Sequence, residues 1–387
     1  MSLSAEEFDL FRVEVRKFIS QRIHPIEQAV DDNDRMNEAE WPKLVKEAID
    51  LGIYAGNIPS EHGGGGLGLL HQSMLWEDFG LTTWPFTYLV GRPNPVLLNC
   101  TTEQKERYLY PVVRGEKTQS FSLTEPGSGS DAAAMRTTAR KVEGGHVLNG
   151  TKHFISHGSD ASFTIAFART GDSKHDITAF LVDRETPGFK IGRRQRMMGW
   201  RGMEQNELVF EDCFLPDSQV LGAVGEGFTV AKSFLIQSRI TMAALCTGMM
   251  ERLIDLTVEY AKSRPVFGEP LSRKQGIQWM VADMVREHYA AQQTYRAAAM
   301  ACDDAIAAGA SHGDIVASQG HLVAIAKLQA SQGLGRVADA AVQIHGGMGW
   351  SKDLPIERLY RDARIYRIVD GADQVLQGII AQHLLKS

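Results

Sequence analysis

The sequence predicts a mainly helical protein that carries a β-rich insert. Apolar residues recur at helical spacing in both end regions, whereas residues from about 120 to 222 form short β-branched or aromatic runs separated by Gly, Asp and Pro. The length of 387 residues also exceeds the size of about 250 to 300 residues at which single hydrophobic cores stop growing. We therefore expect three packed units, at residues 1–118, 119–222 and 223–387.

The N-terminal unit is predicted to begin with an amphipathic helix. Ser4 opens the text SAEE, a capping-box pattern, and Phe8, Phe11, Val15 and Phe18 then recur at helical spacing. Similar helical patterns continue to about residue 118. This unit should therefore be helical throughout.

The middle and C-terminal units have sharply different sequence patterns. In the middle unit, four runs bounded by turn residues are typical of strands: HVLNG, SFTIAFA, DITAFLV and NELVFEDCFLP. From Gly225 onward long helical texts return, including an Ala-rich block at 289–308 with few breakers. The expected order is helical, then β, then helical.

Composition excludes several classes of function. A net charge of -6 with 23% charged residues argues against nucleic acid as a partner. No run approaches the roughly 20 apolar residues of a membrane span, and the acidic start from Glu6 is unlike a secretory signal. A reducing cytoplasm fits best, because no CxxC pair occurs among the cysteines, Cys100, Cys213, Cys246 and Cys302.

Two further patterns are better explained by structure than by a site. The glycine-rich run 63–68 lacks the Lys-Ser/Thr ending of a phosphate loop and follows helical text, so we expect an ordinary loop. His153 and His157 would lie roughly 13 Å apart on a strand, which is too far for one ion to bridge. No metal site is predicted.

The most specific segment is FSLTEPGSGSDA, residues 121–132. Its glycines let backbone N–H groups approach a ligand closely, although its composition alone favours a plain surface loop. As a complete string it resembles the signature of the acyl-CoA dehydrogenase family, and the helical, β, helical order extends the resemblance over nearly the whole chain. The resemblance implies an N-terminal helical domain, a middle β-barrel or β-sandwich domain and a C-terminal four-helix bundle.

The resemblance also implies FAD as cofactor. A second segment, TKHFISHG at 151–158, is similar to the part of the family that packs an aromatic ring and a hydroxyl on the flavin. A flat ring beside the flavin excludes water, which a hydride transfer needs; without the neighbouring motif, Phe154 would be interpreted as an inward-facing strand residue. The residues carried over from the two segments are Phe121, Leu123, Thr124, Ser130, Phe154 and Ser156.

Two later segments resemble the parts of the family that bind the rest of the cofactor. KSRPVFGEPLSRKQ, residues 262–275, matches the pyrophosphate and adenine contact, and AVQIHGGMGW, residues 341–350, matches a turn that receives the FAD of a neighbouring subunit. A planar guanidinium suits pyrophosphate, although Arg264 alone would be interpreted as a solvated helix-end charge. A homodimer or homotetramer with FAD at the interface is implied. The matching residues are Arg264, Phe267, Gln275, Gln343 and Gly347.

The last motif, at 357–384, resembles the family's C-terminal signature, in which an acidic residue before Gly is the catalytic base. Here these are Asp370 and Gly371. By spacing alone, an Asp before Gly at the start of a helix is a turn or N-cap residue. The resemblance implies that Asp370 removes the α-proton of an acyl thioester while the β-hydrogen passes to flavin N5. It also implies that the backbone N–H of Asp370 holds the thioester oxygen.

This motif departs from most relatives, which have Glu at the base position. Asp reaches about 1.3 Å less far, and a displacement of about 1 Å at a reacting centre can cost ~100-fold in rate. Ala372 replaces a common Thr, while Gln374 is retained for the flavin. Nitroalkane oxidases have Arg at the position of Gln377, so this residue disfavours a nitroalkane oxidase. Ser238 occupies the other base position known in the family, so no rival carboxylate is present.

Other residues are expected to line the acyl-CoA path. By resemblance these are Ser130, Leu235, Arg239 and Gly371. Arg92, in GRPNP, falls in the region that shapes the acyl end in relatives. A substrate carboxylate or hydroxyl could pair with it, but we interpret it as a surface arginine.

The function predicted from the sequence is FAD-dependent α,β-dehydrogenation of an acyl-CoA, with electrons passed to an electron-transfer flavoprotein. Two alternatives remain open at this point. One is an oxygen-using flavin oxidase, and the other is a non-catalytic subunit that binds acyl-CoA or a sister chain. Chain length, branching and substitution of the acyl group depend on pocket residues distant in the sequence and are not predicted.

Overall fold

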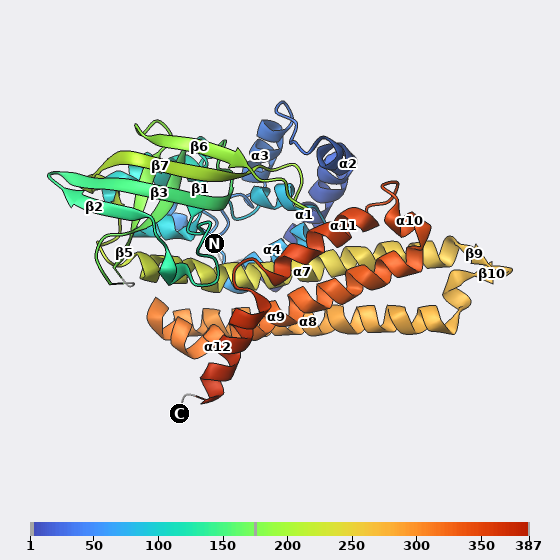
Figure 1. The fold of residues 1–387 in the computed structure, drawn as a ribbon. Helices are drawn as coiled ribbons and strands as arrows, with labels where there is room; N and C mark the ends of the chain where they lie inside the picture. The colour runs from blue at the N-terminus through green and yellow to red at the C-terminus, as the bar shows by residue number, and fades with distance from the viewer. Residues whose placement is uncertain (1–3, 174–175, 386–387) are drawn as a thin grey trace.

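The computed structural model describes residues 4–173 and 176–385. A helical N-terminal part, a β-sheet and a set of long C-terminal helices follow one another along the chain (Figure 1). The expected order of helical, β and helical parts is therefore confirmed. The N-terminal elements are α1 (Ala5–Phe18), η1 (Ile19–Ile23), α2 (His24–Asn33), α3 (Trp41–Asp50), η2 (Ser60–His62), α4 (Leu69–Phe79), η3 (Trp84–Leu89), η4 (Pro95–Asn99), α5 (Thr102–Gln104), η5 (Lys105–Leu109) and α6 (Tyr110–Val113).

The predicted first helix and its cap are both present. The Ser4 side chain accepts from the backbone N–H of Glu7, and the Glu7 carboxylate accepts from the backbone N–H of Ser4 at 2.8 Å. Phe8, Val15 and Phe18 are buried along one face of α1. The glycine-rich segment 63–68 is a loop before α4, as predicted.

The described residues of the middle part form one mixed sheet of eight strands. Its order is β6-β7-β3-β2-β4-β5-β8, and β1 pairs in parallel with β4. The four strand texts identified in the sequence lie in β3, β4, β5 and β7. The elements are β1 (Gln119–Ser122), η6 (Ala132–Ala134), β2 (Thr138–Val142), β3 (Gly145–Ser156), β4 (Phe163–Arg169), β5 (Ile177–Asp183), β6 (Phe189–Arg194), β7 (Gln205–Pro216), η7 (Asp217–Gln219) and β8 (Val220–Leu221).

Both faces of the central strands are buried. In β4, Phe163 and Ile165 pack into a core shared with α7 and the turns before β1, while Ala166 and Ala168 pack into a second core with residues of β3 and β7. Alternate side chains of a strand point to opposite faces. The sheet therefore has no bare face along β4, and one face is pressed against the helical parts that carry the site.

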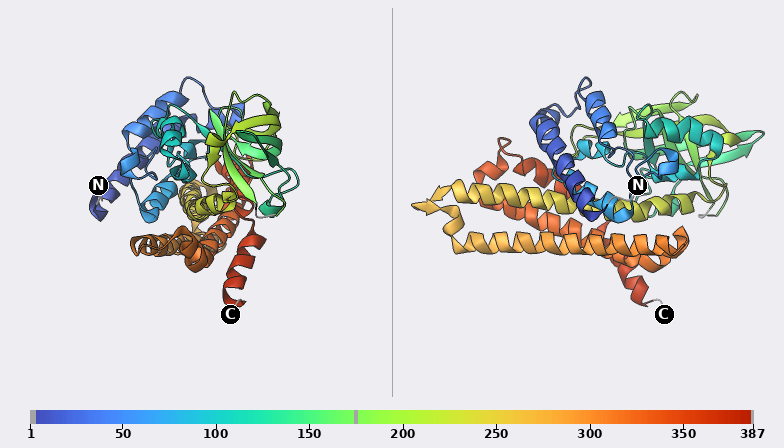
Figure 2. Two further views of the ribbon diagram at one scale, coloured as in Figure 1. Left: turned by 90° about the vertical axis from the view of Figure 1, so that its left-hand side faces the viewer. Right: turned by 180° about the vertical axis from the view of Figure 1, so that it is seen from behind.

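Three long helices dominate the C-terminal part. In two views α7, α8 and α9 run side by side, with the β9–β10 hairpin at one end, while α12 projects away toward the C-terminus (Figures 1 and 2). The elements are α7 (Gly227–Ser263), β9 (Pro265–Val266), β10 (Glu269–Pro270), η8 (Leu271–Arg273), α8 (Gln275–Ala307), α9 (His312–His345), α10 (Gly347–Trp350), α11 (Ile356–Ala363), η9 (Arg364–Arg367) and α12 (Asp373–Leu385).

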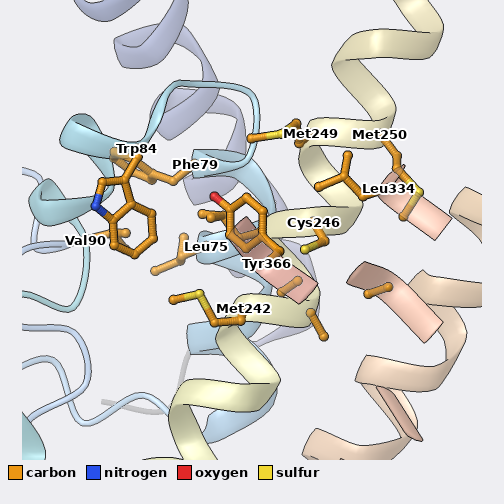
Figure 3. Packing of buried hydrophobic residues seen from close by; sticks show 14 of the residues in the cluster. Leu75, Phe79, Trp84, Val90, Met242, Cys246, Met249, Met250, Leu334 and Tyr366 are labelled. Carbon is orange, nitrogen blue, oxygen red and sulfur yellow. The ribbon is translucent and has the colours of Figure 1, made fainter. Parts of the chain in front are cut away.

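Two glycines let α4 approach α7 closely. A Cβ atom at Gly248 of α7 would lie 1.8 Å from the carbonyl oxygen of Glu77, and one at Gly80 would lie 2.3 Å from that of Leu245. The interface is filled by apolar side chains, among which Tyr366 of η9 lies in the centre (Figure 3). This packing anchors the segment that leads to Asp370. The side chains around Tyr366 include Leu75, Phe79, Met242 and Cys246.

A buried carboxylate ties the loop before β7 to α11. Asp362 is 2% exposed, and its Oδ1 accepts from the backbone N–H of Trp200 at 2.6 Å. Burial raises the pKa of Asp362 to about 7, against the weaker effects of that hydrogen bond and of Arg361. The protein therefore binds a proton at Asp362 that the unfolded chain releases at lower pH.

This difference predicts a pH-dependent stability. Between about pH 4 and pH 7 the folded state holds more protons at Asp362, so the free energy of unfolding falls as pH rises, by up to about 1.4 kcal/mol per pH unit. In Asp362→Asn an amide oxygen still accepts from Trp200 but nothing titrates. Denaturant unfolding at pH 5 and pH 7 should show a smaller loss of stability in the variant. Equal losses in both proteins would contradict the assignment.

Candidate active site

Asp370 lies in the turn between η9 and α12 and is held by α7. The Ser238 hydroxyl donates to Oδ2 of Asp370, and Nε of Arg239 donates to the Asp370 backbone carbonyl at 2.9 Å. Asp370 has a positive φ of 55°, a conformation that Asp tolerates better than most residues. Neighbouring residues of one helix thus hold both the side chain and the backbone of the predicted base.

The next residue is held by α9. Nζ of Lys327 donates to the Gly371 carbonyl at 2.8 Å. Gly371 has φ 108°, and a Cβ there would lie 3.3 Å from Nη2 of Arg239, so only glycine fits without strain. Burial lowers the pKa of both Lys327 and Arg239. The Asp-Gly turn is therefore clamped between two long helices by two largely buried cations.

The sequence reasoning missed two of these contacts. Ser238 was noted only as the absence of a rival carboxylate, yet its hydroxyl is hydrogen-bonded to Asp370. Lys327 was not identified at all. Its position could have been noticed, because Lys327 is a single lysine in the apolar helical segment HLVAIAKLQA. A charged residue on a buried helix face needs a bonding partner.

The two predicted flavin segments lie next to each other. The backbone N–H of His153 donates to the Thr124 carbonyl at 2.9 Å, which joins the segments directly. Phe121 packs against Phe234 of α7, with ring centroids 5.0 Å apart. Leu123 and Thr124 are half-buried, whereas Ser130 is exposed. These segments therefore lie against the helix that carries Ser238.

A bulge in β3 turns Phe154 outward. The pairing of β3 with β7 shifts register between Lys152 and Ile155, and Phe154 has φ 58°. Such a bulge re-aims a side chain. The Phe154 ring is 51% exposed and stacks on His153 at 4.2 Å. The alternative interpretation as an inward-facing strand residue is therefore wrong, and the ring is available to a planar ligand.

A buried ion pair fixes the first of the two predicted flavin segments, residues 121–132. Nζ of Lys152 donates to Glu125 at 2.8 Å and to the Leu123 carbonyl at 3.2 Å. Glu125 also accepts from the backbone N–H of Arg136 and of Thr137. Lys152 is fully buried, and burial lowers its pKa to about 8. This pair was not predicted from the sequence, although both residues lie inside the recognised motifs.

The predicted pyrophosphate and adenine residues lie at the opposite end of the long helices. Arg264 ends α7, about 40 Å along the helix from Ser238, beside the β9–β10 hairpin (Figures 1 and 2). Phe267 in that hairpin has φ 51° and is 94% exposed. Gln275 begins α8, and Gln343 and Gly347 lie at the end of α9 and in α10. One chain does not bring these residues together with Asp370.

The remaining predicted residues are placed as follows. Leu235 lies on α7 one turn before Arg239 and is half-buried. Gln374 lies in the first turn of α12 and is exposed. The interpretation of Arg92 as a surface arginine is wrong, because Arg92 is only 9% exposed. Its guanidinium donates to a backbone carbonyl of β1, which draws it inward.

One group among the described residues has donor atoms close enough to hold a metal ion. It consists of Glu77, Glu251 and His288, whose ligand atoms lie within 4.8 Å of one another. Glu77 already accepts hydrogen bonds from Tyr295 at 2.8 Å and Gln292 at 2.7 Å. The group is thus part of a hydrogen-bonded network between helices.

The order of a helical, a β-sheet and a helical part, with its long C-terminal helices, is the fold of a class of proteins, the acyl-CoA dehydrogenases. Family models of the N-terminal, middle and C-terminal domains of acyl-CoA dehydrogenase match residues 5–116, 120–213 and 225–385. The chain belongs to the acyl-CoA dehydrogenase family. FAD, the cofactor implied by the sequence resemblance, is the cofactor of this family, and a similar solved structure is an FAD complex of PigA, 25% identical with a TM-score of 0.89 over 100% of both chains.

Individual relatives cover the whole chain. An acryloyl-CoA reductase (NADH) of Anaerotignum propionicum is 36% identical over 100% of this chain and 96% of its own length. The mitochondrial short-chain specific acyl-CoA dehydrogenase of Bos taurus is 36% identical over 99% and 91%. The butyryl-CoA dehydrogenase structure from Megasphaera elsdenii has a TM-score of 0.88 at 31% identity over 100% and 99%. Over the described ranges, no helix has the length and apolar character needed to cross a bilayer.

Proposed function

We propose that this protein catalyses FAD-dependent α,β-dehydrogenation of an acyl-CoA, with Asp370 as the base. The observation that supports this most strongly is the clamped turn, in which Ser238, Arg239 and Lys327 hold Asp370 and Gly371. General bases work when they are held within reach of the proton they remove. When bound, FAD would accept the β-hydrogen as hydride. Asp370 accepts the α-proton, and its backbone N–H donates to the thioester oxygen.

The residues that face outward fit a planar dinucleotide. Phe154 presents half of its ring to the surface beside Thr124 and Ser156, and Ser156 is hydrogen-bonded to Gln205, which fixes its hydroxyl. Phe267 is almost fully exposed at the far end of the bundle. Large exposed aromatic rings usually mark a surface that a ligand or a partner covers. The proposed flavin site uses Thr124, Phe154 and Ser156, and the proposed adenine site uses Phe267.

We further propose that the flavin-site residues of one subunit meet the adenine-site residues of another across a subunit interface, in a homodimer or homotetramer. The separation of about 40 Å between Ser238 and Arg264 along α7 is longer than one extended dinucleotide. Exposed aromatic residues along and beyond the bundle, including Trp279, Tyr289 and Trp350, also fit coverage by a second copy.

Two further proposals concern the setting of the reaction. Electrons pass from the reduced flavin to an electron-transfer flavoprotein; a similar solved structure from Acidaminococcus fermentans, described as an electron transferring flavoprotein, is 31% identical with a TM-score of 0.88. The cytoplasm remains the proposed location. All four cysteines are buried and free, which fits a reducing compartment.

The proposed reaction is tested with a panel of acyl-CoAs. Saturated straight, branched, aryl and hydroxyacyl thioesters are mixed with the FAD-loaded protein without oxygen, and bleaching of the flavin absorbance is followed. At least one saturated thioester should bleach the flavin, and the electron-transfer flavoprotein should restore it. A flavin that stays yellow with every thioester would instead support a non-catalytic acyl-CoA-binding subunit.

A second candidate is an oxygen-using oxidase. The substitution at Ala372 removes a possible flavin hydrogen bond, and the prolyl acyl carrier protein oxidase AnaB is structurally similar, 25% identical with a TM-score of 0.85. Oxygen consumption at the rate of turnover, with no other acceptor present, would establish the oxidase. Slow reoxidation by air would support the dehydrogenase.

The subunit-interface proposal makes a prediction for Arg264. Arg264→Ala removes the cation expected to bind the pyrophosphate, and the loss of hydrogen bonds to a charged group, worth about 1.5 to 3 kcal/mol, should weaken FAD binding about 10- to 100-fold. Equilibrium dialysis of the apoprotein with FAD measures this. Arg286→Ala is the matched control, because Arg286 is an exposed arginine on α8. Equal FAD affinity in the two variants would reject the assignment of Arg264.

A further inference from the structure

Arg92 is a buried cation held at the edge of the sheet. It lies between η3 and η4 and is 9% exposed. Its Nη2 donates to the Gln119 carbonyl at 2.9 Å, and Nε2 of Gln119 donates to the Arg92 carbonyl at 2.8 Å. These reciprocal contacts fix the backbone and direct the side chain inward against β1. The position of the guanidinium is therefore determined by the fold.

Within residues 4–173 and 176–385, no carboxylate lies at ion-pair distance from this cation. Among the described residues, none of the ion pairs within 4.0 Å includes Arg92, whereas Arg358, which is buried to a similar degree, lies 3.3 Å from Glu27. A buried charge is costly unless it is paired and hydrogen-bonded. A guanidinium has five N–H donors, and a single backbone carbonyl uses only part of that capacity. The remaining capacity suits an anionic ligand.

Asp160, in the loop after β3, is already engaged in hydrogen bonds. Asp160 accepts from Nδ1 of His157 at 2.9 and 3.0 Å. Burial, with a smaller effect of the Arg92 charge, lowers the pKa of His157. Asp160 is close enough for Arg92 to contribute to the lowering of its pKa, but the two do not form an ion pair.

Tyr88 connects Arg92 to the second predicted flavin segment, residues 151–158. The guanidinium carbon lies 5.1 Å from the centroid of the Tyr88 ring, and that ring meets His157 edge-on at 4.2 Å. Ser156, the last residue of β3 and one of the predicted flavin contacts, directly precedes His157. Burial raises the pKa of Tyr88, Arg92 opposes this, and the charge of Asp370 adds to it. The Tyr88 ring thus contacts both Arg92 and His157, the neighbour of Ser156.

We propose that Arg92 binds a carboxylate at the far end of the acyl group, so that the preferred substrate is an ω-carboxyacyl-CoA. This rests on the proposed function, since it assigns the acyl chain of the same site. The planar guanidinium forms paired, charge-assisted hydrogen bonds with a carboxylate. An unsubstituted alkyl end would instead leave the buried cation facing hydrocarbon, which is unfavourable. The cation thus selects for the charged chain and against the plain one.

The experiment compares ω-carboxyacyl-CoAs with unsubstituted acyl-CoAs of matched chain length. The readout is kcat/KM from flavin bleaching in the wild type, Arg92→Met and Arg92→Lys. The wild type should prefer the carboxylate by about 10- to 100-fold, the worth of hydrogen bonds between charged groups. Arg92→Met should lose this preference, and Arg92→Lys should keep part of it. Arg140→Met, which alters an exposed arginine on β2, is the matched control and should keep the full preference.

The outcomes distinguish the proposed role of Arg92 from the proposed dehydrogenase function. If unsubstituted chains bleach the flavin as well as carboxylated chains do, the dehydrogenase stands and the role of Arg92 is rejected. An unchanged preference in Arg92→Met also rejects it, and lost stability would then identify a purely structural cation. If no thioester of either kind bleaches the flavin, the proposed function itself fails. Flavin content and thermal unfolding of each variant show whether Arg92→Met folds, and Arg92→Lys provides the test if it does not.

Discussion

Asp370→Asn should lose reduction of the flavin by acyl-CoA while retaining bound FAD. The amide cannot accept the α-proton, and a positioned general base contributes about 100- to 10,000-fold to a rate. The change preserves side-chain volume and leaves an oxygen to accept from Ser238, so the clamped turn should survive. Stopped-flow bleaching under anaerobic conditions measures the rate, and the visible spectrum of the purified variant measures flavin content. Full-rate reduction by the variant would exclude Asp370 as the base.

Two companion variants separate the proton acceptor from its positioning. Ser238→Ala keeps the carboxylate but removes its hydrogen bond, so the rate should fall less than in Asp370→Asn and its dependence on pH should change. Asp370→Glu lengthens the acid by one methylene, and it tests whether the site is shaped for the shorter acid. A loss in Ser238→Ala as large as that in Asp370→Asn, with an unchanged pH profile, would indicate a structural role for the serine.

Local patterns were sufficient for much of the fold. Three elements were predictable from local sequence patterns alone. They are the helix capped by Ser4, strand β4 and helix α7, and all three are present. Helix and strand periodicity are properties of neighbouring residues, so a single sequence reveals them. Four short strands, β1, β2, β6 and β8, were not identified individually, because their texts are brief and their pairing partners supply the order.

The site was predicted less completely, because its contacts join distant segments. Ser238 and Lys327 reach the Asp-Gly turn from 132 and 44 residues away, and no local pattern encodes either contact. Arg92 was misinterpreted for the same reason, since its burial depends on Gln119 of a later strand. The outward turn of Phe154 depends on a register shift between β3 and β7. In each case, pairing between remote segments decides where a locally unremarkable residue points.

The buried pair of Lys152 and Glu125 leads to the second large effect. Lys152→Met keeps a long apolar side chain but leaves the buried Glu125 without its cation, and breaking such a pair costs about 3 to 5 kcal/mol. The Leu123 carbonyl would also lose its donor, so the segment that carries Leu123 and Thr124 should become less well positioned. We therefore expect both a lower free energy of unfolding and weaker retention of FAD. Denaturant unfolding of the apoprotein and the FAD content after gel filtration measure the two effects separately.

A matched exposed lysine provides the control. Lys141 pairs with Asp217 at the surface of β2, where an ion pair contributes about 0 to 1 kcal/mol, so Lys141→Met should leave both measurements near the wild-type values. A double variant, Lys152→Met with Glu125→Gln, should recover part of the stability, because no buried carboxylate then lacks a cation. If it recovers stability without recovering FAD retention, the ammonium acts on the flavin segment through the Leu123 carbonyl. If Lys152→Met is as stable and retains FAD as well as Lys141→Met, the pair does not support the flavin segment.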